Sequence, residues 1–246
     1  MKHFLAATLS SLLLASAAQA ANPPAPPIVV ELFTSEGCSS CPPADALLGK
    51  LHQTYGAEVI ILGEHVDYWN HLGWADRFSS VALTQRQADY ARRFNLDSSY
   101  TPQLVIDGHA QLVGNDEPGV RSQLALAARQ PKPTQIQLHW VSDGQLQINV
   151  DGKSEHDGKV LLAITEDGLS TQVGRGENGG RTLRHSGVVR ELREIGTLRA
   201  GKFSSSVKAV RQREWKPENL RAVVFVQKAG HGDITGAASL PYPLDE

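Results

Sequence analysis

The chain has only two cysteines, Cys38 and Cys41, and they lie three residues apart between an apolar run and a helical pattern. The apolar run covers residues 28–34 and is typical of a buried strand, whereas residues 43–55 have the apolar spacing of a helix. At a helix N-terminus, free backbone N–H groups and the helix dipole stabilise a thiolate. This placement favours a reversible dithiol–disulfide couple.

Two other interpretations of the cysteine pair stay open. As a permanent disulfide, the pair would close a very short loop, for which chain entropy gives only about 2 kcal/mol of stability. A zinc site needs four ligands, and the chain has no second cysteine pair to complete them. The spacing therefore favours redox chemistry over a structural staple or a metal site.

The N-terminal residues 1–20 are typical of a secretion signal. Lys2 supplies a basic start, residues 4–15 are apolar, and residues 18–20 fit the small-x-small cleavage pattern. The apolar stretch is short for a bilayer span, so we expect a periplasmic or secreted protein without a stable membrane anchor. A retained anchor is the alternative. In an oxidising compartment, a lone cysteine pair is either oxidised at rest or kept reduced by a partner.

The charge and the length of the chain exclude few classes of function. The formal net charge is −2, and loss of Lys2 with the signal makes it −2 − 1 = −3, which does not suggest binding to nucleic acid or to anionic membranes. Removal of 20 residues from 246 leaves 226, enough for two modest domains. Dithiol chemistry requires no bound cofactor, so none is predicted. The sequence does not indicate an oligomeric state.

Residues 21–27 form a proline-rich leader, and residues 28–130 predict a first domain with the element order β-α-β-α-β-β-α. Its predicted elements are strands at 28–34 and 58–66, helices at 43–55, 82–95 and 118–129, and a hairpin at the Asp107-Gly108 turn. Apolar strands separated by a helix suggest a parallel β-α-β unit, and an Asp-Gly turn is a strong hairpin signal.

A Pro-Lys-Pro linker at residues 131–133 separates this part from residues 134–246, where apolar and polar residues alternate. Ile136, Leu138 and Trp140 point to one face, as expected for a half-buried strand. Further strands are predicted near residues 159–165, 181–192, 203–210, 220–228 and 233–240. Short strands with little helix predict an antiparallel β-sandwich as the second domain, within an α/β protein overall.

Residues 28–130 resemble the thioredoxin fold. The resemblance rests on the Cys38-Ser39-Ser40-Cys41 pair after the first strand, on the element order, and on Thr101-Pro102 before the hairpin strand. Over most of its length, the chain also resembles a secreted thioredoxin-like family called a domain of unknown function. The matching segments are residues 30–43, 65–69, 100–103 and 176–183. That family has no established reaction.

The resemblance implies roles for five residues. Cys38 would be the exposed nucleophile, and Cys41 would resolve the mixed disulfide. A cis peptide bond before Pro102 would place the carbonyls of Thr101 and Pro102 at the edge where a peptide docks, an ordinary trans proline being the alternative. Glu31 would be a buried acid that assists proton transfer, the alternative being a surface or edge carboxylate.

Residues 67–80 form an aromatic-rich insertion after the second predicted strand, at the edge where α/β sheets place ligand sites. Its candidate substrate-binding residues are Tyr68, Trp69 and Trp74. They would form a platform for a polypeptide, or else a small core beneath a loop. A metal site from His65, Asp67 and His71 with the thiolates does not match a compact ligand motif, so no metal is predicted.

The sequence therefore predicts an exported protein, similar to thiol–disulfide oxidoreductases, that exchanges disulfides with a polypeptide partner through Cys38 and Cys41. The alternative is a non-catalytic peptide-binding or copper-chaperone-like metal-binding module in which the pair is a structural disulfide. Neither the partner nor the direction of electron flow follows from the sequence.

Overall fold

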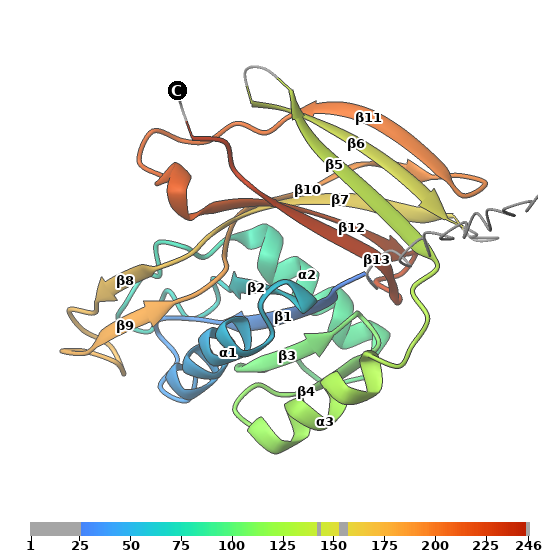
Figure 1. Ribbon diagram of the computed structural model, residues 1–246. Coiled ribbons are helices and arrows are strands. Elements are labelled where there is room, and N and C mark those ends of the chain that lie inside the picture. The colour runs from blue at the N-terminus through green and yellow to red at the C-terminus, as the bar shows by residue number, and fades with distance from the viewer. Residues whose placement is uncertain (1–25, 142–143, 153–156, 245–246) are drawn as a thin grey trace, which may run out of the picture.

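The computed structural model describes residues 26–141, 144–152 and 157–244. The predicted signal peptide and most of the leader at 21–27 lie outside the described residues. The chain has a mixed α/β architecture, in which a large sheet runs through the molecule with helices below it and a smaller sheet above it in Figure 1. Within the described residues, no helix is both long and apolar enough to span a bilayer.

The first half of the chain confirms the predicted element order, with boundaries that shift by two residues at most. Its elements are β1 (Ile28–Thr34), α1 (Pro42–Tyr55), a 3₁₀ turn (Gly56–Glu58), β2 (Val59–His65), α2 (Val81–Arg93), β3 (Gln103–Ile106), β4 (Ala110–Val113) and α3 (Glu117–Ala127). Asp107 and Gly108 have φ angles of 49° and 63°, the left-handed pair that a tight hairpin requires.

Within the described residues, the second half consists mainly of strands. These elements are β5 (Thr134–Val141), β6 (Gln145–Gly152), β7 (Gly158–Glu166), β8 (Leu169–Gln172), β9 (Thr182–His185), β10 (Val188–Leu198), β11 (Lys202–Lys208), the turn Pro217–Asn219, β12 (Leu220–Lys228) and β13 (Ile234–Pro241). The single strand predicted over residues 181–192 was wrong, and β8 was not predicted. Gly187 divides β9 from β10, because its φ is 60° and a Cβ there would lie 2.7 Å from the carbonyl oxygen of Ile61.

The two halves of the chain share one eight-stranded sheet, in the order β13-β12-β7-β10-β2-β1-β3-β4. β1 and β2 are parallel, whereas β3 is antiparallel to β1 and β4 to β3. The halves meet where β10 lies parallel to β2, with Val188 paired to Gly63. The predicted division into domains at 28–130 and 134–246 stays a prediction, since the sheet continues across it.

Helices cover both faces of the first four strands. Leu48 of α1 and Leu124 of α3 pack with Val30 of β1, whereas Leu83 of α2 packs with Val29 on the opposite face. A separate sheet, β11-β6-β5, packs through residues such as Ile148 against β7 and β12, and β8 pairs with β9 in a two-stranded ribbon. This ribbon projects beside the start of α1 in Figure 1.

Candidate functional site

The two cysteines form a disulfide at the point where β1 leads into α1. Cys41 is the N-cap of α1, and its carbonyl oxygen accepts hydrogen bonds from the backbone N–H groups of Ala44 and Asp45. Pro42 occupies the first turn of the helix, where no N–H is needed. Cys41 therefore stands at the helix start, and Cys38 precedes it in the turn.

Both cysteines are completely buried, with an exposed fraction of 0%. The expectation that Cys38 is exposed was therefore wrong. Ser39 and Ser40 between the cysteines are exposed, and the Ser40 hydroxyl lies 3.4 Å from the Cys38 sulfur. Solvent thus reaches the turn that carries the disulfide but not the sulfur atoms.

A loop from the second half of the chain lies against the disulfide turn. We call residues 173–181, between β8 and β9, the covering loop. The Asn178 side-chain amide donates hydrogen bonds to the carbonyl oxygens of Glu36, at 3.0 Å, and Cys38, at 2.9 Å. The Glu177 carboxylate accepts a hydrogen bond from the backbone N–H of Ser39. Gly176 has a φ of 78°, and a Cβ there would lie 3.2 Å from Trp74.

Four ionisable side chains form a buried cluster next to the disulfide. We call Glu36, His65, Asp76 and His185 the histidine–carboxylate cluster. Glu36 lies 3.2 Å from Nε2 of His185, and Asp76 lies 2.6 Å from Nδ1 of His65. The Asp76 carboxylate also accepts a hydrogen bond from the backbone N–H of Glu36, and this bond connects the two pairs. Because Glu36 is two residues before Cys38, the cluster adjoins the disulfide turn.

The cluster holds its carboxylates in the ionised form. Burial raises the pKa of Glu36. The hydrogen bond from His185 and smaller hydrogen-bond contributions lower it by more, so the pKa of Glu36 lies below its ordinary value. Burial likewise raises the pKa of Asp76, and the charge and hydrogen bond of His65 bring it below its ordinary value. Nδ1 of His185 is buried and has no hydrogen-bond partner among the described residues.

Asp45 is a further buried carboxyl group that sequence reasoning missed. It lies one helical turn after Cys41, so the two side chains leave the same face of α1. Its carboxyl group accepts a hydrogen bond from the Thr34 hydroxyl at 3.2 Å. Burial raises the pKa of Asp45 to about 7. The spacing of four residues from Cys41 was the signal that could have identified it.

Glu31 is fully buried on the central strand β1, so its alternative interpretation as a surface or edge carboxylate was wrong. Its carboxylate accepts hydrogen bonds from Nε of Arg86 at 2.6 Å and from the Tyr90 hydroxyl at 2.5 Å. The neighbouring Glu64 is also buried, and this burial raises its pKa well above the usual range. The proton-transfer role of Glu31 stays a prediction.

The Thr101–Pro102 peptide bond is cis, which confirms that expectation. The carbonyl oxygen of Pro102 accepts a hydrogen bond from the backbone N–H of Gly114 at 2.9 Å, so this oxygen already has a partner within the protein. The Thr101 hydroxyl accepts a hydrogen bond from the Trp69 indole at 2.9 Å. Docking of a peptide at Thr101 stays a prediction.

The three aromatic candidates are half-buried and anchored by hydrogen bonds, and Trp69 and Trp74 lie beside the disulfide turn. Tyr68 donates to Gln87, and with Trp69 it packs against the small core around Phe33. Trp74 donates to Glu36 at 2.8 Å and contacts the covering loop. Substrate binding by these residues stays a prediction.

The residues considered for a metal site do not converge. His65 pairs with Asp76, Asp67 accepts a hydrogen bond from Thr84, and His71 is exposed. Across the described ranges, no group of three or more His, Cys, Asp and Glu side chains is arranged to hold a metal ion.

The chain belongs to the family described as "Protein of unknown function (DUF1223)", whose model matches residues 29–227, and this confirms the expected family of unknown function. A crystal structure of a protein from Agrobacterium tumefaciens is similar, with 28% identity and a TM-score of 0.73 over 92% of this chain and 100% of that chain. The structure of HBP35 of Porphyromonas gingivalis has 13% identity and a TM-score of 0.65 over 89% of this chain and 76% of that chain, a likeness of fold alone. No curated protein matches the chain.

Proposed function

We propose that this member of the DUF1223 family is an exported thiol–disulfide oxidoreductase-like protein whose partner is a polypeptide. The observation that carries the proposal is the Cys38–Cys41 disulfide at the start of α1. A cysteine pair at that position has helix N–H groups and the helix dipole available to stabilise a thiolate. The chemistry needs no bound cofactor.

We also propose that residues 28–130 form a thioredoxin-like unit. The order of the elements, the parallel pairing of β1 with β2 and the antiparallel hairpin of β3 and β4 support this assignment. The placement of α1 and α3 on one face and α2 on the other supports it as well. In this arrangement the disulfide lies at the carboxyl ends of the parallel strands, where α/β sheets place their sites.

In the reducing direction, the Cys38 thiolate attacks a disulfide of the partner, forming a mixed disulfide and releasing one partner thiolate. The Cys41 thiolate then attacks the Cys38 sulfur, which re-forms the Cys38–Cys41 disulfide and releases the second partner thiolate. Two electrons pass to the partner, and the two protons lost by the cysteines are taken up by the partner's thiolates. The oxidising direction is the reverse sequence.

Because the sulfur atoms are buried, the fold above them must open before exchange, and we propose that the covering loop is the part that moves. The loop is held over the turn by two hydrogen bonds from Asn178 and one to Glu177. At a net 0.5–1.5 kcal/mol for each bond, their loss costs roughly 2–4 kcal/mol. A docking partner can supply that free energy, since a micromolar complex corresponds to about 8 kcal/mol.

A second candidate function is a peptide-binding module in which the disulfide is permanent. The complete burial of both cysteines is the observation that favours it. In this case the covering loop would protect the disulfide rather than open, and binding would not depend on the redox state.

The experiment that separates the two is equilibration in glutathione buffers followed by trapping of partners with Cys41→Ser. Exchange predicts that the pair cycles between dithiol and disulfide and that Cys41→Ser accumulates mixed disulfides on Cys38. The matched Cys38→Ser variant should trap far fewer partners. A pair that stays oxidised across the buffer series, with equal trapping by both variants, would favour the permanent disulfide.

A further inference from the structure

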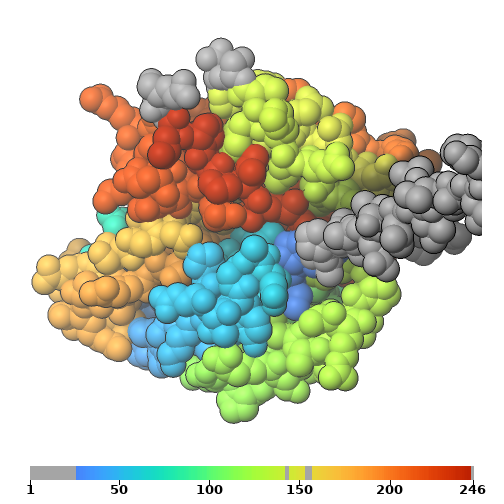
Figure 2. Space-filling model, in the orientation of Figure 1, coloured from blue at the N-terminus to red at the C-terminus, as the bar shows by residue number. Residues whose placement is uncertain are grey.

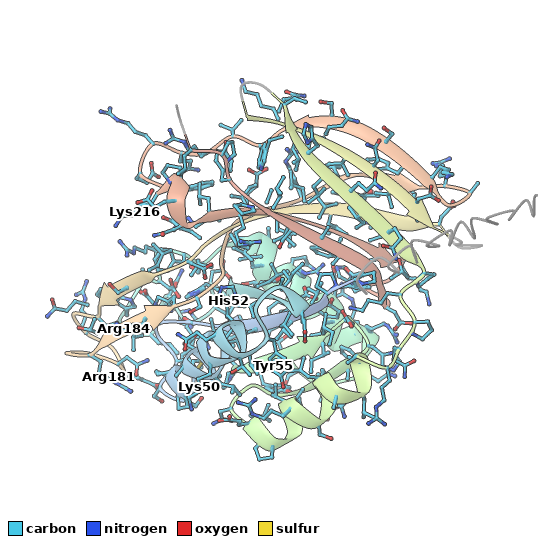
Figure 3. All side chains as sticks on the ribbon, viewed as in Figure 1. Lys50, His52, Tyr55, Arg181, Arg184 and Lys216 are labelled. Atoms are coloured by element: carbon cyan, nitrogen blue, oxygen red, sulfur yellow. A yellow bond between two sulfur atoms is a disulfide. The ribbon has the colours of Figure 1, made fainter. Side chains whose placement is uncertain are left out.

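A groove about 380 Å³ in volume begins immediately after Cys41 and runs between α1 and β9. Its α1 side includes Pro42, Asp45 and Lys50, and its β9 side includes Arg181 and Arg184. Figure 3 labels Lys50 on α1 and both arginines at β9, and Figure 2 shows these two segments next to each other on one face of the molecule. The groove therefore lies beside the disulfide turn and is built from both halves of the chain.

The charges along this groove are mainly positive, although the whole chain has a formal net charge of −2. The Lys50 side chain is 62% exposed, with Glu117 at 3.7 Å. Arg181, the last residue of the covering loop, and Arg184 of β9 are also exposed. The acid at the floor of the groove is Asp45, which is buried, and burial raises its pKa to about 7. Near pH 7 Asp45 is therefore about half ionised, and it offsets only part of the positive charge of Lys50, Arg181 and Arg184.

A second hollow of about 230 Å³ lies farther along α1, next to the first. His52 lines this hollow together with Asp167, Gly187 and Arg221, and the Asp167 carboxylate lies 3.9 Å from Nε2 of His52. Gln53 and Ser186, next to His52 and Gly187 in the sequence, line the groove. An extended segment that follows α1 from Pro42 to His52 would pass both hollows.

We propose that the groove between α1 and β9 binds an extended acidic segment of the polypeptide partner. This inference specifies which class of polypeptide would take part in the proposed disulfide exchange, and it rests on that proposed function. Complementary charge would steer such a segment to the disulfide and select it over basic polypeptides. The second half of the chain would then supply part of the recognition surface.

Arg181 connects the groove to the covering loop. Its guanidinium donates a hydrogen bond to the side-chain oxygen of Asn178 at 2.9 Å, and Asn178 in turn holds the carbonyl oxygen of Cys38. A carboxylate in the groove would compete for this guanidinium, because it carries the opposite charge and can accept two parallel hydrogen bonds, whereas Asn178 offers one neutral oxygen. Binding of the acidic segment would loosen Asn178 and so favour opening above Cys38.

The test measures the binding of a short dye-labelled peptide of alternating aspartate and glycine to the oxidised mature protein by fluorescence anisotropy. The same peptide with lysine in place of aspartate is the counter-probe. We expect preferential binding of the acidic peptide, weakened by salt. The double variant Lys50→Glu/Arg184→Glu should lower its affinity about tenfold or more.

Lys208→Glu, on the exposed edge strand β11, is the matched control and should leave the affinity unchanged. The neutral pair Lys50→Gln/Arg184→Gln should give an intermediate loss. Equal binding of the two peptides, or an equal loss in Lys208→Glu, would overturn the proposal. Because the oxidised protein is used, acidic-peptide binding without disulfide exchange would contradict the proposed function alone.

Discussion

The side-chain amide of Asn178 donates a hydrogen bond to the carbonyl oxygen of Cys38 over 2.9 Å, although 140 positions separate the two residues. The same amide also bonds Glu36, so one side chain from the covering loop holds two points of the disulfide turn. His185, at the end of β9, pairs with Glu36 as well. The second half of the chain is therefore part of the disulfide site.

Asn178→Ala is expected to make Cys38 more reactive. Loss of the two Asn178 hydrogen bonds favours opening of the covering loop by about 1–3 kcal/mol, which corresponds to roughly 5- to 150-fold in the open population. The measurement is the alkylation rate of Cys38 by iodoacetamide in a Cys41→Ser background, where no second thiol competes.

Asn149→Ala is the control for this measurement, because Asn149 is an exposed asparagine on β6 that accepts a hydrogen bond from Ser204. The alkylation rate of Cys38 in this variant should match that in the Cys41→Ser background. If Asn178→Ala does not exceed this control, the covering loop does not limit access to Cys38.

Local pattern predicted the elements around the disulfide, because strand and helix periodicity, the Asp107-Gly108 turn and the cysteine spacing are all local signals. The partners of the disulfide turn could not be predicted in this way. Asn178 and His185 lie beside it because the second half of the chain packs against the first, for example where β10 pairs with β2 and the backbone N–H of Gly63 donates to the carbonyl oxygen of Gly187. Such contacts join residues far apart in the sequence, so local pattern does not predict them.

Asp45→Asn is expected to remove a pH dependence of stability. Between the ordinary pKa of 3.8 and about 7, folded Asp45 holds a proton that the unfolded chain has released. The free energy of unfolding therefore falls as pH rises through this window. At pH 8 the variant should be more stable than the parent by on the order of 2–4 kcal/mol, and near pH 4 the difference should vanish.

Urea unfolding of the parent and Asp45→Asn across this pH range checks the expectation, and the Thr34 hydroxyl still has an amide oxygen to donate to in the variant. Asp97→Asn, at an exposed position, is the control, and its free energy of unfolding should depend on pH as that of the parent does. A difference between parent and Asp45→Asn that is the same at every pH would show that Asp45 does not titrate in this window.

Arg86→Met is expected to destabilise the fold by about 3–5 kcal/mol, because it leaves the buried Glu31 without its cation. Glu31→Gln/Arg86→Met should recover much of that loss, since it removes both charges together. Arg92→Met is the control on the same helix, because the Arg92 side chain is 68% exposed. Urea midpoints provide the comparison, and equal losses in the single and double variants would contradict a charge-pair explanation.

Reduction of the Cys38–Cys41 disulfide is expected to lower stability only modestly. The bond has a sequence separation of 3, and closure of so short a loop contributes about 2 kcal/mol in the chain-entropy account. Urea midpoints of the oxidised protein, the reduced protein and Cys38→Ser/Cys41→Ser provide the measurement, and the last two should agree. A pair that cycles must leave the fold intact in both states. Unfolding of the protein on reduction would therefore argue against disulfide exchange and for the permanent disulfide of a binding module.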